Sequence, residues 1–165
     1  MLLKDNLSIF VEKAKANFIK DGFLTSILAA MIDGQLQIIM LQMENNEDKE
    51  AFSQRMQDLI SKNRLSEYIM IVEAWQAEVK DNLEEIRDWL KTHGTLATRP
   101  DRKEIVSILY ASAKEEIHYT ADINRGIIPP VLDNWNTSTR KVEFRIEEFS
   151  SRFSGLFIRS KSGAN

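Results

Sequence analysis

The pattern of hydrophobic and polar positions first predicts an amphipathic helix over residues 6–20. Its apolar residues recur at the spacing of one helical face. They are Leu7, Phe10, Val11, Ala14 and Phe18. Asp5 or Asn6 is placed to cap the first amides, and Gly22 to end the helix in a left-handed conformation. This helix needs an apolar surface to pack on.

The segment "FLTSILAAMIDGQLQIIMLQM", residues 23–43, predicts a β-hairpin. Asp33-Gly34 is a pair that a two-residue type I′ turn favours, because both turn positions need a positive φ. The flanking runs are apolar and rich in β-branched residues, as strands usually are.

A second amphipathic helix is predicted over residues 47–62, with Asn45 or Asn46 as its cap. The following stretch "EYIMIVEAW", residues 67–75, reads as a strand. Its first half is apolar on both faces, which is typical of a strand at the centre of a sheet with helices on both sides.

The remaining elements are shorter. A helix is predicted over residues 82–92 with Gly94 as its end, followed by two strands, 104–112 and 117–125, joined near Lys114-Glu115. Residues 126–139 are expected to be irregular because of Pro129 and Pro130. "RKVEFRIEEF", residues 140–149, alternates as a final strand, with a short helix as the competing interpretation of its end.

This order predicts an α+β domain with a mostly antiparallel five- or six-stranded sheet and two main amphipathic helices packed on it. The elements run α-β-β-α-β-(short α)-β-β-loop-β. One parallel strand pair around the second helix is the alternative arrangement. A single domain is expected over residues 1–159, with a loose tail at 160–165.

Composition and charge narrow the functional classes. The 22 basic and 25 acidic residues give a formal charge of −3 and are interleaved, so no nucleic-acid partner is expected. The longest apolar run, "ILAAMI" at 27–32, is too short to cross a membrane. With charges already at Lys4 and Asp5, no secretory signal is expected, and we expect a cytoplasmic protein without membrane contact.

The chain has no cysteine, which excludes disulfides, thiolate metal sites and thiol catalysis. It has two histidines, and His118 and Asp122 would lie roughly 13 Å apart along one strand, too far to bind the same metal ion. No phosphate-binding glycine loop, nucleophile elbow, zinc-protease or calcium-loop motif is present. We therefore expect no metal and no cofactor.

Glu73 is the first candidate for chemistry, because it lies inside the apolar stretch of residues 68–75. A buried carboxylate needs a partner or a raised pKa. One hypothesis is an enzyme that uses Glu73, Arg102 and His118 for acid–base chemistry in a cleft. The alternatives are a structural ion pair with Arg99, Arg102 or Arg125, or exposure of the far half of the strand to water.

The segment "TRPDRKE", residues 98–104, is the densest polar cluster. Arginine forms forked contacts with phosphates and carboxylates, so a second hypothesis is a small anionic ligand at this loop. Its residues would be Arg99, Asp101 and Arg102, with Arg125 nearby. The alternative is a solvated loop with weak mutual ion pairs.

Apolar residues in the irregular segment favour protein partners, since apolar side chains on a loop cover their own core or dock on another surface. They are Ile127, Ile128, Val131, Leu132 and Trp135. With the C-terminal "FSGLF", this loop is predicted to form a homodimer contact. The leading interpretation is a non-catalytic protein-interaction or regulatory module that self-associates and contacts an unidentified protein partner.

Overall fold

The computed structural model describes residues 2–77, 83–94, 96, 98–141, 153, 156 and 157. A single 3-10 turn, Lys4–Asn6, leads into the first helix. The helices are α1 (Leu7–Asp21), α2 (Asn46–Ser61) and α3 (Leu83–His93). The strands are β1 (Ile27–Ile32), β2 (Gln35–Met40), β3 (Leu65–Ala77), β4 (Arg102–Ser112), β5 (Glu115–Asn124), β6 (Val131–Leu132) and β7 (Asn136–Lys141).

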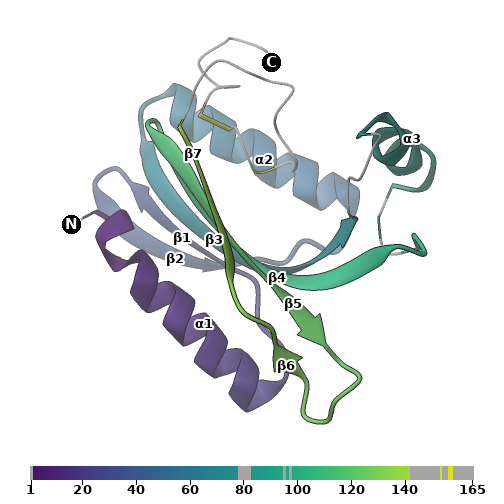
Figure 1. The fold of residues 1–165 in the computed structure, drawn as a ribbon. Helices are drawn as coiled ribbons and strands as arrows, with labels where there is room; N and C mark the ends of the chain where they lie inside the picture. The colour runs from purple at the N-terminus through teal and green to yellow at the C-terminus, as the bar shows by residue number, and fades with distance from the viewer. Residues whose placement is uncertain are drawn as a thin grey trace.

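The strands form a curled sheet in the order β2-β1-β3-β4-β5-β6, and β7 also pairs with β5 (Figure 1). Each strand pair that the structure describes is antiparallel. The predicted α+β class is therefore confirmed, with β3 at the centre as its apolar faces indicated. Because β2 and β3 both pair antiparallel with β1, α2 connects two strands that run in the same direction without touching.

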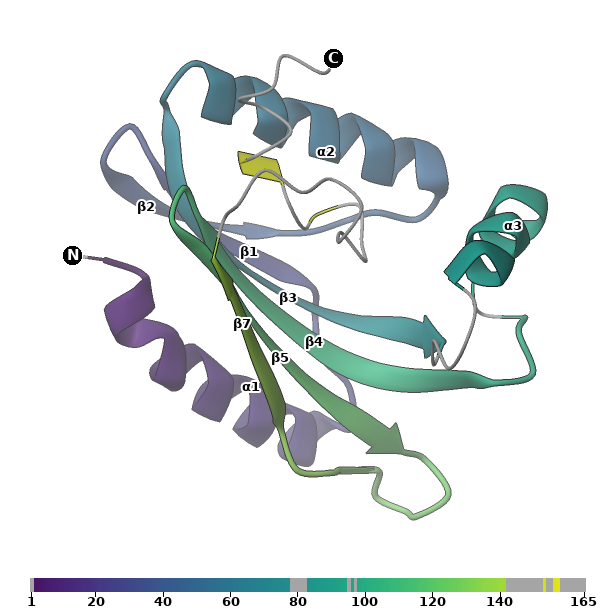
Figure 2. The ribbon, with the colours of Figure 1, turned by 45° about the horizontal axis from the view of Figure 1, so that its top comes forward.

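The two long helices lie on opposite faces of this sheet (Figure 2). The core under α1 includes Phe18, Ile69 and Ile108. The core under α2 includes Met56, Tyr68 and Leu109. Burial on both faces is what made β3 apolar at successive positions, since neighbouring side chains in a strand point to opposite sides.

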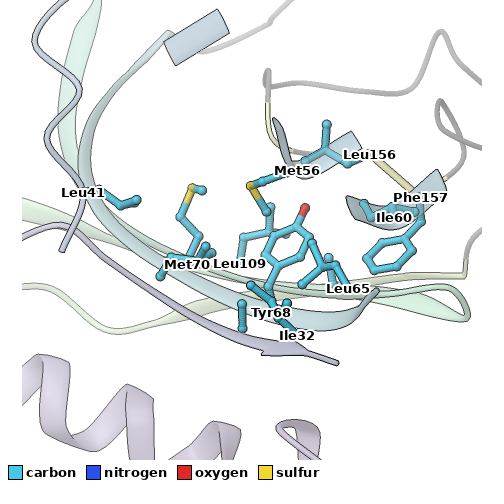
Figure 3. Close-up of a cluster of buried hydrophobic side chains, with 13 residues drawn as sticks. Ile32, Leu41, Met56, Ile60, Leu65, Tyr68, Met70, Leu109, Leu156 and Phe157 are labelled. Carbon is cyan, nitrogen blue, oxygen red and sulfur yellow. The ribbon is translucent and has the colours of Figure 1, made fainter. Parts of the chain in front are cut away.

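The C-terminal residues that the structure describes belong to the α2 side of the core. Figure 3 shows Leu156 and Phe157 beside Tyr68 and Met56. The ring of Phe157 stacks on Tyr68, with the ring centroids 6.0 Å apart. The Tyr68 hydroxyl donates a hydrogen bond to the carbonyl of Phe153 (2.5 Å). The "FSGLF" segment, predicted to take part in a dimer contact, thus places Leu156 and Phe157 inside this chain's own core.

Several local signals acted as predicted. Asp33 and Gly34 both have positive φ (51° and 77°) in the β1–β2 turn. Gly22 is left-handed at the end of α1, and its N–H donates to the Phe18 carbonyl (2.7 Å). Asn45 caps α2 by accepting from the Asp48 N–H (2.8 Å). At α1, however, the predicted side-chain cap is absent, because the 3-10 turn precedes the helix and Asn6 Nδ2 instead donates to the Leu2 carbonyl.

The end of the sheet differs from the prediction. β6 and β7 lie within or overlap residues 126–139, which were expected to be irregular. β7 is mostly polar, "NTSTRK", so its sequence lacks the apolar alternation that marks a half-buried strand. Pairing with β5 still orders it. Val142, Phe144 and Ile146, the apolar face of the predicted final strand, lie outside the described residues, as does the tail at 160–165.

Candidate functional site

Glu73, the first candidate for chemistry, joins α1 to the sheet. Its Oε1 accepts a hydrogen bond from the backbone N–H of Leu24 (2.7 Å), just after α1 ends. Its Oε2 lies 3.2 Å from Nη2 of Arg125, so the predicted ion pair is confirmed with Arg125 as the partner. Arg125 also binds Glu104 (2.7 Å) and donates to the Gly22 carbonyl (3.0 Å). This cluster fixes the end of α1 to β3, β4 and the end of β5.

A second carboxylate on β3 is more deeply buried, and sequence reasoning missed it. Glu67 is only 4% exposed. It accepts hydrogen bonds from the Leu3 N–H (2.7 Å) and the Tyr110 hydroxyl (3.0 Å). Burial, followed by the nearby carboxylate charge, raises the pKa of Tyr110 to about 12. The alternation of β3 puts Glu67 on the face of Ile69 and Ile71, and the chain before α1 docks on it through the Leu3 N–H.

The three residues of the enzyme hypothesis do not converge. Glu73 is directly opposite Val106, in the core under α1. His118 is directly opposite Leu109, in the core under α2, so the two side chains lie on opposite faces of the sheet. Arg102 donates to the Arg99 carbonyl (2.9 Å), and its guanidinium lies 5.3 Å from the Trp75 ring centroid. His118 Nε2 lies 2.7 Å from Ser107 Oγ instead.

The Arg99–Glu104 loop is held largely by its own ion pairs. Arg99 binds Asp101 through two hydrogen bonds (2.6 and 2.8 Å) and lies over the Trp89 ring. The hydrogen bonds to Asp101 raise the pKa of Arg99 above its ordinary value. Within the described part of the chain, Nη1 of Arg99 is buried without a hydrogen-bond partner. Arg125, predicted as a fourth contributor, belongs to the Glu73–Glu104 cluster instead.

The apolar loop at residues 127–135 is divided between core and surface. Leu132 and Trp135 pack on the core under α1. Ile127, Ile128 and Val131 are exposed, Ile128 at 94%. Pro130 lies beside Gly22, since a Cβ at Gly22 would be 3.7 Å from its Cδ. The loop therefore lies against the end of α1 and presents three exposed apolar side chains.

A groove that sequence reasoning missed lies between α1 and the sheet and is bordered by β2 at Ile38, with a volume of about 430 Å³. α1 forms one wall, and β1, β2 and β3 contribute apolar side chains. The lining includes Ile9, Phe10, Phe23, Ile27, Ile38 and Ile71, with Lys13 and Asp21 as its charged members. Phe23 and Ile9 are exposed large apolar residues. Such a surface is a default candidate for binding another molecule.

The groove exists because α1 lies towards one side of the sheet. The start of the chain contacts Glu67 on β3 and forms an ion pair with β5 through Lys4 and Glu115. The end of α1 is held at Glu73 and by Arg125 at the end of β5. β2, two strands from β3, is left uncovered, and each of its six residues is exposed.

Searches for a metal site, for a membrane-spanning helix and for related proteins gave the following results. Among the described residues, no group of three or more His, Asp or Glu side chains is placed to hold a metal ion. No helix in the same set is both long and apolar enough to span a bilayer. Comparison of the chain with protein-family models, curated proteins and solved structures gives no match.

Proposed function

We propose that this protein is a non-catalytic protein-interaction module that self-associates, with the exposed strand β2, which borders the groove, as its docking surface. The observation that carries the proposal is β2, an edge strand whose residues are all exposed. Its sequence, "QLQIIM", contains four large apolar residues and no charge. An exposed apolar strand at a sheet edge offers both apolar surface and free backbone hydrogen-bonding groups to another chain.

Covering the apolar side chains of β2 would contribute favourable free energy to association. Leu36, Ile38 and Met40 are 40%, 61% and 67% exposed on the side of β2 that borders the groove. Burying apolar surface stabilises a complex by roughly 25 cal/mol per Å², before the entropic cost of association. The structural contacts of Glu73 also support the non-catalytic part, because they give this carboxylate a role in holding α1.

The test is molar mass as a function of concentration, by light scattering and sedimentation. The monomer has a mass of 19.1 kDa, and we expect the mass to approach twice that value through the micromolar range. Ile38→Lys should shift the protein to monomer. Thr139→Lys, on the exposed β7 at the other end of the sheet, is the matched control and should leave association unchanged.

Two outcomes discriminate among the proposals. A wild-type protein that stays monomeric at every concentration would show that the self-association proposal is wrong. If Ile38→Lys remains dimeric and Ile128→Lys becomes monomeric, self-association holds but the contact is the 127–135 loop. Circular dichroism of each variant checks that the fold is intact, which we expect because both side chains are exposed.

A second candidate function is binding of a small anion at Arg99, favoured by its buried and unpartnered Nη1 among the described residues. A ligand that binds only the folded protein raises its melting temperature. Thermal shift with inorganic phosphate and nucleotides should then show an increase that Arg99→Lys loses. Identical curves with and without these anions would count against this candidate.

A further inference from the structure

The backbone of β2 presents particular residues to the free edge. The N–H of Leu41 donates to the Ser26 carbonyl (2.8 Å), which continues the β1–β2 pairing by one residue. In an antiparallel pair, successive residues of one strand direct their backbone groups alternately towards and away from the neighbour. Odd-numbered residues of β2 therefore face β1, whereas the N–H and C=O groups of Leu36, Ile38 and Met40 face outward.

The side chains of the same three residues share one face of the sheet. They lie opposite Met31, Ala29 and Ile27 of β1, which belong to the core under α1 or pack against it. The outward backbone groups and the exposed apolar side chains thus come from the same positions. An added strand would gain hydrogen bonds and apolar contacts at the same three positions.

The two ends of the sheet differ in how their edges are protected. Proteins usually protect an edge strand with charges, proline or a bulge. β7 ends in "TRK", with two basic residues. β2 and the three residues after it, "QLQIIMLQM", contain no charge and no proline, and the β1–β2 register has no bulge. An uncharged edge can meet its own image without like-charge repulsion.

We infer that the occupant of this edge is β2 of a second copy, paired antiparallel across a two-fold axis perpendicular to the sheet. This inference rests on the proposed function and names its partner. Such an axis keeps the same face of both sheets on the same side, and directly opposite residues share a face. Even-numbered residues of one β2 are therefore opposite even-numbered residues of the other. The register that pairs all three outward-facing residues places Ile38 opposite the partner's Ile38, and Leu36 opposite the partner's Met40.

This register gives hydrogen-bond partners to the outward-facing N–H and C=O groups of β2. The outward-facing groups of Leu36, Ile38 and Met40 all fall in hydrogen-bonded pairs, and the two sheets become one continuous sheet. Both α1 helices then lie on the same side of that sheet. Ile38 of each copy lines its own groove, so the two grooves meet at the axis. A homodimer of this kind is isologous, with the same patch used by both copies.

Single-cysteine cross-linking tests the register, since the chain has no native cysteine. Cα atoms of a hydrogen-bonded antiparallel pair are about 5.5 Å apart, within the range for a disulfide. Ile38→Cys should therefore give a disulfide-linked dimer as the major product of mild oxidation. Gln37→Cys is the matched control, because Gln37 faces Ile39 of the partner and the two copies of residue 37 would be roughly 8 Å apart. It should remain mainly monomeric.

The outcomes separate this inference from the proposed function. If the wild-type mass doubles but Ile38→Cys cross-links no better than Gln37→Cys, the edge pairing is wrong and self-association stands. If Ile128→Cys cross-links instead, the contact lies at the 127–135 loop. If the wild-type protein is monomeric and Ile38→Cys stays reduced, a second copy does not occupy this edge and both proposals fail.

Discussion

Two carboxylates on β3, Glu67 and Glu73, hold the two ends of α1. Glu67 accepts from Leu3 before the helix, and Glu73 accepts from Leu24 after it. The 15 residues of α1 make it about 22 Å long, and the six steps from Glu67 to Glu73 span about 20 Å. The spacing of the two acids therefore matches the length of the helix that they position.

Removing the buried acid should destabilise the protein. Glu67→Ala leaves the Leu3 N–H and the Tyr110 hydroxyl without their acceptor, and we expect the free energy of unfolding to fall by about 3 kcal/mol. Urea denaturation measures the change. Glu12→Ala, on the exposed face of α1, is the control and should change stability by less than about 0.5 kcal/mol. Equal effects of the two substitutions would contradict the role of Glu67.

Tyr110 makes the stability of the fold depend on alkaline pH. Its pKa is raised to about 12, whereas an unfolded tyrosine ionises at about 10. Above pH 10 the unfolded chain therefore binds fewer protons than the folded chain, so stability falls as the pH rises towards 12. Below pH 10 this contribution is fully present.

Tyr110→Phe should remove this part of the pH dependence. Between pH 10 and 12, the free energy of unfolding should fall less steeply for the variant than for the wild type, because phenylalanine does not ionise. Denaturation at a series of pH values measures both slopes. Parallel curves would show that Tyr110 ionises equally in the folded and unfolded states.

At the scale of elements, the cap of α2 is a local device with a measurable effect. Asn45 accepts from the Asp48 N–H and satisfies one of the free amides at the helix start. Asn45→Ala should lower the free energy of unfolding by about 1 kcal/mol. Asn45→Asp keeps an acceptor and suits the helix dipole, so it should retain most of the stability. A loss of the same size in both variants would argue against capping.

The two edge strands of the sheet show that the exposure of a strand cannot be read from its composition. β2 is apolar and exposed, whereas β7 is polar, and those of its side chains that the structure describes are exposed. From hydrophobicity alone, the apolar β2 would be expected to be covered, and the polar segment that forms β7 would be expected to be irregular. β2 is exposed because the residues that anchor α1 are on β3 and β5, so that α1 does not cover β2.

For the whole molecule, edge pairing predicts an alternating pattern of amide exchange in β2. At low concentration, the amides of Leu36, Ile38 and Met40 should exchange with solvent faster than those of Gln37 and Ile39, which face β1. Raising the concentration should slow the first set, because dimerisation would bond those N–H groups. Exchange followed by NMR measures both sets. Concentration-independent rates in a protein that dimerises would place the contact elsewhere.

The local elements of this protein could be predicted from the chain itself because their signals are local. The Asp33-Gly34 turn, the Gly22 helix end and the Asn45 cap depend on residues within a few positions of each other. The central place of β3 could also be predicted, since apolar residues on both faces require cover on both sides. Together these features were sufficient for the α+β class and the antiparallel sheet.

Tertiary structure alone decided which residues meet. Glu67 is buried by Leu3, 64 positions away, and Arg125 reaches Glu73 across 52 positions. Whether β2 is covered depends on where α1 docks, and no pattern within β2 encodes that position. Secondary structure follows from short-range periodicity, whereas the burial of a carboxylate and the exposure of a strand follow from contacts between distant segments.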